Sequence, residues 1–267
     1  MFPTQHWSDA AVASGAFHEV AIGADVVARI ASGPHHHDRS IREWQIATQI
    51  SDLFVTFPVP RPVTTVRSDS VRSGYLLTRL PQSEKPSSDW ARVRSSYEAL
   101  LGLLHDAPVT AQLPAARSWC GGDLMRVLDE ELTDLLGDDA QAAIRAVATV
   151  EGLPGTTPVL VHGDFGPHNI IWRDGVAGAL IDWDHACIDD PAIDIAPLIG
   201  AYGSAQVRQI VTDDVLGRAM VHRATLPLQV AVAAHNVGRR ALRDHALGNF
   251  RSRLHAGVLY DPDGAHP

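Results

Sequence analysis

The stretch that decides the fold is VHGDFGPHNIIW, residues 161–172. It places two histidines, an aspartate and an asparagine within residues 162–169, between two apolar runs. Three interpretations are open at this point: a metal-binding histidine cluster, a polar turn, or the catalytic loop of an enzyme. The rest of the sequence discriminates between them.

The composition describes an ordinary globular protein of 267 residues, with 45% hydrophobic and 20% charged residues. A net charge of −9 disfavours nucleic acid, which is bound by neutralising its phosphates, and suits a cationic small molecule. The sequence shows no secretory signal and no run of roughly 18 apolar residues that would span a membrane. Since its two cysteines, Cys120 and Cys187, are isolated, we expect a cytoplasmic protein. The oligomeric state is not indicated by the sequence.

The N-terminal part is rich in strand patterns. Residues 17–31 alternate around a Gly-Ala-Asp turn and predict a two-stranded hairpin whose second strand carries Arg29. Prolines make residues 57–63 extended, and GYLLTRLP, residues 74–81, predicts a further strand before a polar linker.

One helix is predicted between these strands. Ser40 and Glu43 fit a capping box, and residues 44–54 continue with helical spacing. The three histidines 35–37 before it could bind a transition metal, but consecutive side chains point in different directions. A solvated loop is therefore the preferred interpretation of this triplet.

The C-terminal part is mainly helical. Trp90 begins an apolar pattern at three- and four-residue steps that predicts a helix capped by Ser88 or Asp89. Further elements are expected as follows: helices over 121–136 and 139–151, a strand at 158–162, a hairpin around residues 173–175, and helices from about 191. The order predicts an α+β fold.

The polar residues of the opening stretch gain a partner when the hairpin is considered. The chain returns at Asp182, so this carboxylate can come near Asn169 although thirteen residues separate them. Two converging oxygen donors suit Mg²⁺, which keeps substrate phosphates as further ligands. Asp164 would then remain free to accept a proton from a hydroxyl.

At these residues the chain resembles the aminoglycoside phosphotransferase family. HGDFGPHN, residues 162–169, matches its H-G-D-x-x-x-x-N loop, and residues 181–196, IDWDHACIDDPAIDIA, match its second motif. The resemblance extends to three N-terminal segments: VVARI, FPVPRPV and YLLTRLP. It implies a bilobal protein-kinase-like fold, with a small β-rich nucleotide-binding lobe over 1–80 and a larger, mainly helical catalytic and substrate-binding lobe over 81–267.

The resemblance also implies roles for individual residues. Asp164 would be the catalytic base, and Asn169 and Asp182 would hold Mg²⁺. Arg29 would contact the nucleotide phosphates in place of the usual lysine, with Glu43 orienting it. Phosphoryl transfer needs these groups because its catalysis is mostly positioning and charge stabilisation.

Four further residues complete the expected site. Backbone groups near Thr78 and Leu80 would bind the purine, while His162 and Asp194 would support the catalytic loop. The turn that should cover the phosphates offers one glycine, Gly15, and so departs from a full glycine-rich loop.

Simpler explanations exist for Glu43 and Arg29, and an alternative exists for two histidines of the loop. Glu43 could serve only the capping box, and Arg29 could be an exposed charge on an alternating strand. His162 and His168 could be metal ligands, although the resemblance makes the first structural and the second a loop residue.

The expected activity is transfer of the γ-phosphoryl of ATP or GTP, with Mg²⁺, to a hydroxyl of an aminoglycoside-like antibiotic. The same reaction on choline, homoserine, a thiosugar or a macrolide is an alternative. Two further alternatives are an inactive nucleotide-binding pseudokinase and a histidine-rich metalloprotein. The sequence does not choose between ATP and GTP or name the acceptor.

Overall fold

The computed structural model describes residues 2, 7, 11–14, 18–33, 35–81, 83–85, 87–108, 113–114 and 123–267. The chain forms two compact units, one of Met1–Lys85 with Asn169–Asp184 and one of Pro86–His168 with His185–Pro267. The α+β class is confirmed, because the first unit is rich in strands and the second in helices. The hairpin within residues 169–184 groups with the first unit, which differs from the lobe boundary expected after residue 80.

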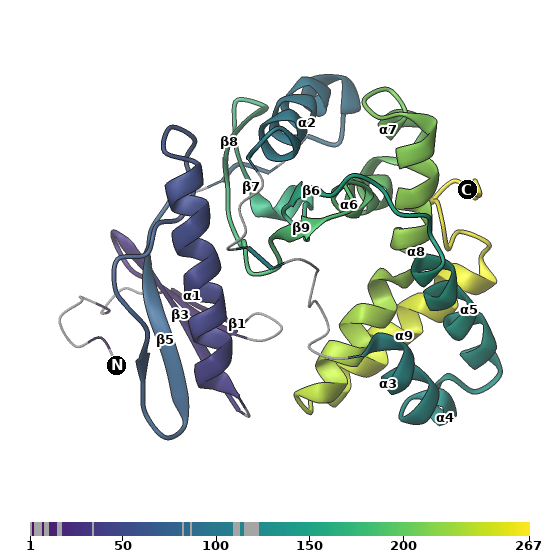
Figure 1. Ribbon diagram of the computed structural model, residues 1–267, viewed down its shortest axis with the longest axis horizontal. Helices are drawn as coiled ribbons and strands as arrows, with labels where there is room; N and C mark the ends of the chain where they lie inside the picture. The colour runs from purple at the N-terminus through teal and green to yellow at the C-terminus, as the bar shows by residue number, and fades with distance from the viewer. Residues whose placement is uncertain are drawn as a thin grey trace. The chain divides into compact units, whose positions relative to one another are not determined.

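A five-stranded antiparallel sheet forms the centre of the first unit, in the order β1-β2-β3-β5-β4 (Figure 1). Its strands are β1 (Ala11–Ser14), β2 (His18–Ile22), β3 (Val26–Ser32), β4 (Arg67–Ser68) and β5 (Arg72–Thr78). The predicted hairpin is confirmed: β2 pairs with β3, and Gly23 N donates to Val26 O at 2.9 Å across the turn. The phosphate-covering turn at Gly15 lies outside the described residues.

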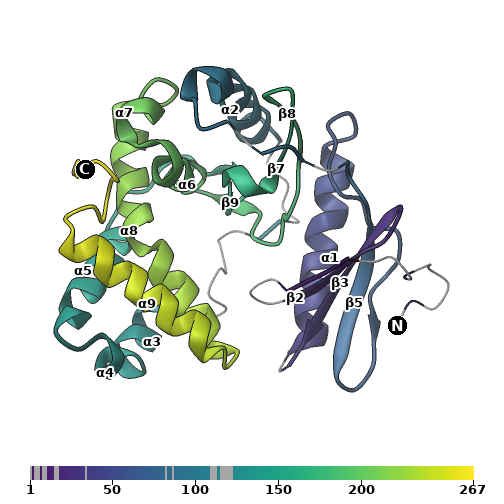
Figure 2. The same cartoon turned by 180° about the vertical axis from the view of Figure 1, so that it is seen from behind.

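Helix α1 (His36–Leu53) packs against β5 and β3 of this sheet (Figure 2). It begins four residues before Ser40, so the capping-box prediction is wrong: Ser40 and Glu43 lie inside the helix. Ser40 is buried, and its hydroxyl lies 2.7 Å from that of Ser73. At the other end, Arg61 donates to Ser51 O at 2.6 Å and Phe54 O at 2.9 Å, which satisfies terminal carbonyls of the helix.

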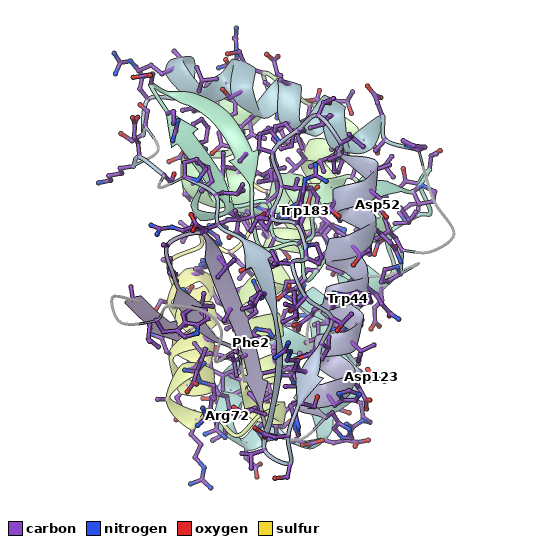
Figure 3. All side chains as sticks on the ribbon, turned by 90° about the vertical axis from the view of Figure 1, so that its left-hand side faces the viewer. Phe2, Trp44, Asp52, Arg72, Asp123 and Trp183 are labelled. Carbon is purple, nitrogen blue, oxygen red and sulfur yellow. The ribbon has the colours of Figure 1, made fainter. Side chains whose placement is uncertain are left out.

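The side chains of α1 fix its position on the sheet. Trp44 points from the helix into the unit (Figure 3), and its indole Nε1 donates to Thr64 O at 2.9 Å. Ala47 packs with Tyr75 and Leu77 of β5 in a small buried cluster. The helix therefore covers the face of β5 on which Tyr75 and Leu77 lie.

The predicted second hairpin is confirmed as β7 (Ile170–Arg173) and β8 (Val176–Leu180). Asp174 and Gly175 form its turn with φ values of 51° and 74°, the left-handed conformation that two-residue hairpin turns require. Trp172 N donates to Ser83 Oγ at 2.9 Å, and Glu84 N donates to Trp172 O at 2.9 Å. These bonds join the hairpin to the segment that follows β5.

The second unit is built mainly from helices. They are α2 (Trp90–His105), α3 (Leu124–Glu130), α4 (Thr133–Leu136), α5 (Ala140–Glu151), α6 (Ala192–Tyr202), α7 (Ser204–Val207), α8 (Asp213–Asn236) and α9 (Arg240–His255). Two 3₁₀ turns are also present, η1 (Gly137–Asp139) and η2 (Pro167–Asn169). The last residue of η2, Asn169, belongs to the first unit. Asp89 is the predicted cap of α2 and accepts from Ala91 N. The helix expected over 121–136 is divided into α3 and α4, and Thr133 at the start of α4 donates its hydroxyl to Asp129 O at 2.6 Å.

A two-stranded sheet of β6 (Val159–Val161) and β9 (Cys187–Asp189) lies in the same unit. Helix α8 packs against α5, α6 and α9. Apolar residues of α3, α5, α8 and α9 meet in one core that includes Leu128, Leu228 and Phe250. No helix among the described residues is both long enough and apolar enough to cross a membrane.

Truncation of the α9 anchor should weaken this core. Phe250 is 0% exposed, so Phe250→Ala should lower the free energy of unfolding by about 3–5 kcal/mol through lost burial and a cavity. Val176→Ala is the control, because Val176 is 60% exposed and should change stability by less than about 0.5 kcal/mol. Chemical denaturation checks both, and equal effects would contradict the assigned core.

Candidate active site

A pocket of about 500 Å³ opens within the first unit. Apolar side chains form most of its walls, among them those of Val20, Ile22, Val27, Leu77, Leu80, Ile171 and Ile181. Thr78 also lines it, and Arg29, Arg79 and Asp182 contribute charged groups. A mostly apolar pocket with a few charged groups has the composition of a small-molecule binding site.

Arg29 reaches the pocket from β3, where it is paired with Val20 on one side and Tyr75 on the other. Its side chain is 11% exposed, so the interpretation as an exposed charge is wrong. Nη1 donates to Asp182 Oδ1 at 2.9 Å, and Nη2 forms a short contact with Asp184 Oδ2. Burial alone would lower the pKa of Arg29, but the charges of Asp184 and Asp182 raise it well above its usual value.

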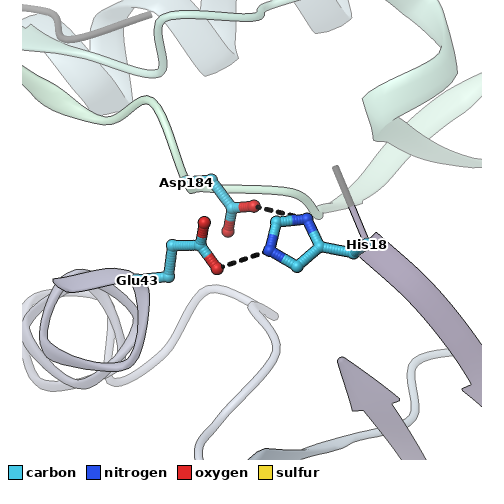
Figure 4. A group of neighbouring side chains, drawn as sticks. All are labelled: His18, Glu43 and Asp184. Atoms are coloured by element: carbon cyan, nitrogen blue, oxygen red, sulfur yellow. Dashed lines mark hydrogen bonds and ion pairs between the residues drawn. The ribbon is translucent and has the colours of Figure 1, made fainter. Parts of the chain in front are cut away.

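Glu43 is held by His18. The Glu43 carboxylate is 3% exposed and lies 2.7 Å from His18 Nε2 (Figure 4). His18 Nδ1 lies 3.4 Å from Arg29 Nη2. The orienting role expected for Glu43 stays a prediction, and the described contacts link Glu43 to Arg29 through His18. An imidazole from β2 occupies the position between them.

Asn169 and Asp182 lie at the base of the β7–β8 hairpin. Ile181 N donates to Asn169 O at 2.9 Å, which holds the two ends of the hairpin together. Asp182 has a φ of 64°, a strained conformation for an aspartate that is typical of functional positions. Its side chain is 44% exposed and already carries a cationic partner, Arg29, on one oxygen.

Buried and half-buried carboxyls lie around Arg29. Burial raises the pKa of the Asp184 carboxyl well above its usual value, and the charges of Glu43 and Asp182 add to that effect while Arg29 opposes it. Carboxylate and amide oxygens are hard ligands, so Asp182 and Asn169 offer the donor types that Mg²⁺ prefers.

The predicted purine-binding segment is held by hydrogen bonds to the backbone of two other segments, at Arg61 and Asp25. Thr78 N donates to Arg61 O at 2.8 Å, and the Thr78 hydroxyl accepts from Arg61 N at 2.9 Å. Arg79 N donates to Asp25 O at 2.9 Å. The amides of Thr78 and Arg79 are thereby occupied, whereas Leu80 lines the pocket.

The loop that carries Asp164 is held from within the second unit. Asp194 on α6 is 0% exposed and accepts from His162 N and Gly163 N, both at 2.9 Å. Asp164 N donates to His162 Nδ1 at 3.3 Å, so the buried imidazole braces the loop. This is the geometry that the predicted supporting roles of His162 and Asp194 require.

The surroundings of Asp164 favour its ionised form. Burial would raise its pKa, but the hydrogen bond and charge of His168 and the charges of His162 and His185 bring the pKa below its usual value. His168 Nε2 lies 3.5 Å from Asp164 Oδ2. A carboxylate that is ionised at neutral pH and 28% exposed has the protonation state and the access that a general base needs.

The histidine triplet before α1 differs from the expected loop. His35 is the N-cap, with a φ of 56°, and His36 and His37 form the first turn of the helix. His36 Nδ1 contacts Gly33 O at 2.9 Å, and His37 Nδ1 contacts Ser68 Oγ at 2.6 Å. His36 thus contacts the turn before the helix, and His37 contacts β4.

Two residues of the site escaped sequence reasoning, His18 and Asp184. Strand parity could have found the first, since His18, Val20 and Arg29 share one face in the β2–β3 register. Asp184 is two positions after Asp182 in the quoted motif, but only the fold shows that its carboxylate turns to Arg29.

Comparison with known proteins agrees with this fold. Viomycin phosphotransferase of Streptomyces vinaceus is 27% identical over 264 residues, which cover 90% of this chain and 92% of that protein. The GDP complex of wild-type aminoglycoside 2'-phosphotransferase-IIIa superposes with a TM-score of 0.73 at 16% identity, covering 94% of each chain. Macrolide 2'-phosphotransferase type I gives a TM-score of 0.67 at 18% identity over 90% of each chain.

The fold is therefore that of the kinase-like phosphotransferases, and the predicted kinase-like fold is confirmed. The model of the phosphotransferase enzyme family matches residues 10–224, and the chain belongs to this family. The expectation of a phosphotransferase that acts on an alcohol group is confirmed as well.

Gly163 offers a test of the loop geometry. Its φ is 82°, and a Cβ there would lie 2.3 Å from His185 O, so Gly163→Ala should displace the loop and abolish most activity. Gly175→Ala is the matched control, because Gly175 has a φ of 74° but nothing within 4 Å of a Cβ. Comparable loss in both variants would mean that backbone strain, and not the contact with His185, limits the position.

Proposed function

We propose that the protein is a Mg²⁺-dependent O-phosphotransferase that moves the γ-phosphoryl of ATP or GTP to a hydroxyl of an antibiotic of the aminoglycoside-like kind. Residues 1–80 would act as the nucleotide-binding lobe and residues 81–267 as the catalytic and substrate-binding lobe. The observation that carries the proposal is that Arg29 and Asp182 line the same apolar pocket. We place the activity in the cytoplasm, where nucleoside triphosphates are available.

The pocket assigns the parts of the nucleotide. Its apolar walls, together with Thr78 and Leu80, would hold the purine ring. Arg29 would bind the phosphates, because a buried guanidinium keeps its charge at every working pH. Solved relatives carry GDP together with kanamycin and ATP together with streptomycin, which supports a nucleotide as the phosphoryl donor.

Asn169 and Asp182 would hold the magnesium ion. When bound, Mg²⁺ neutralises charge that develops on the transferred phosphoryl group. Nη1 of Arg29, which now donates to Asp182, would be the donor available to a phosphate oxygen.

Asp164 would act as the general base. Its carboxylate would orient the acceptor hydroxyl and take its proton as the new bond to phosphorus forms. His162 and Asp194 would keep the loop in place through the bonds to the backbone of residues 162–164.

The acceptor is proposed from charge and from the relatives. A net charge of −9 suits a polycationic molecule. Viomycin, kanamycin and gentamicin appear in the names of similar proteins and structures, and a macrolide phosphotransferase also shares the fold. Cationic antibiotics are therefore the first acceptors to test, with macrolides, choline, homoserine and thiosugars as the alternatives.

Removal of the proposed base tests the mechanism. Asp164→Ala should lower kcat by about a thousandfold or more, while the Kd for nucleotide changes by less than about threefold. Asp52→Ala is the control, because Asp52 is an exposed acid on α1 (Figure 3). Coupled-enzyme kinetics and calorimetry provide the two values, and full activity of Asp164→Ala would refute the assignment.

An acceptor panel tests the substrate. Viomycin, kanamycin, gentamicin, a macrolide, choline and homoserine should each be offered with ATP and with GTP, in the presence of Mg²⁺ or of EDTA. We expect nucleotide consumption and a phosphorylated product with a cationic antibiotic, and no turnover with EDTA. Nucleotide binding without turnover on every acceptor would support a pseudokinase instead.

A further inference from the structure

His18 occupies an unusual position among charged groups. It is 9% exposed at the start of β2, and Figure 4 shows its ring between Glu43 on α1 and Asp184 after β8. Nε2 lies 2.7 Å from Glu43 Oε2, whereas Nδ1 lies 4.0 Å from Asp184 Oδ2, beyond hydrogen-bond range. The near partner of Nδ1 is Arg29 Nη2, at 3.4 Å.

The donors and acceptors of the neighbours assign the proton on the ring. An ionised carboxylate only accepts, so Nε2 must carry the proton that it donates to Glu43. A guanidinium only donates, so Nδ1 must present a lone pair to Arg29 Nη2. The neutral ring with its proton on Nε2 satisfies both contacts. The other tautomer satisfies neither of them.

We propose that His18 is a positioning residue for Arg29, through which Glu43 acts on the guanidinium. Glu43 holds the ring, the ring accepts from Nη2, and Asp182 and Asp184 contact Nη1 and Nη2, while Nε is buried without a hydrogen-bond partner among the described residues. The arrangement fixes Arg29 without a direct bond to Glu43. This role rests on the proposed function, because it matters for catalysis only if Arg29 binds the phosphates.

The same three side chains could be read as a metal site, because atoms of His18, Glu43 and Asp184 lie within 4.8 Å of one another. The guanidinium of Arg29 already contacts two of these three residues. A metal ion there would have to displace this fixed cation, so the arrangement favours positioning over metal binding.

Two variants of His18 test the role in kinetics. His18→Leu should lower kcat/KM for the nucleotide by about ten- to a hundredfold, the range expected for a lost hydrogen bond to a charged group. The KM for the acceptor should stay within about twofold. His18→Gln, whose amide provides both a donor and an acceptor, should recover most of the loss. His18→Leu with unchanged kcat/KM would overturn the proposal.

A double-mutant cycle tests whether Glu43 acts through the ring. Glu43→Gln should lower kcat/KM in the wild-type background, and its effect should shrink to less than about twofold in the His18→Leu background. Additive losses would show that the two residues act independently and would overturn the relay. His37→Leu, an exposed histidine on the same helix as Glu43, is the control for histidine removal.

A measurement on the unmodified protein keeps the test independent of folding and activity. Nitrogen-15 NMR should show His18 neutral with its proton on Nε2, and a proton on Nδ1 or a zinc-induced shift of the ring would overturn the assignment. A wild-type protein that transfers no phosphate to any acceptor would refute the proposed function. An active wild type matched by His18→Leu would refute the positioning role alone.

Discussion

The buried charge of Arg29 is the constraint on which the first unit depends. A guanidinium that is 11% exposed needs counter-charges and hydrogen-bond acceptors close by, since an isolated buried charge is strongly destabilising. The fold supplies them from three different elements: the end of β8 with Asp182 and Asp184, the start of β2 with His18, and α1 with Glu43. The sheet, the helix and the hairpin are therefore tied together at one residue.

In the second unit, the polar loop that carries Asp164 lies against buried residues and must be held in place there. Asp194 does so with one carboxylate that accepts from two consecutive backbone amides, and it is completely buried. The helix that carries Asp194 is in turn anchored near its start by Asp190, which accepts hydrogen bonds from Arg218 and from Ala192 N. Burial would raise the pKa of Asp190, but hydrogen bonds from His222, Arg218 and Ala192 outweigh burial and lower the pKa to about 2. Asp164 thus projects from a loop whose backbone has few alternative conformations.

Much of this could be predicted from local patterns. The two motifs located Asp164, Asn169 and Asp182, and periodicity located the helices that begin at Trp90 and Ala140. The errors arose where a local pattern competed with a tertiary contact. Ser40 fits a capping box by spacing, yet it is bonded to Ser73 within an already formed helix.

The sequence by itself determined the class of protein, because its two motifs carry characteristic residue types at a fixed spacing along one loop and one hairpin. It also determined the alternation that puts Arg29 on the pocket face of its strand. Only the tertiary structure decided that Glu43 meets His18 and that Asp184 meets Arg29. Such partners come from segments up to 155 residues apart, and their choice depends on how buried charges are balanced in three dimensions.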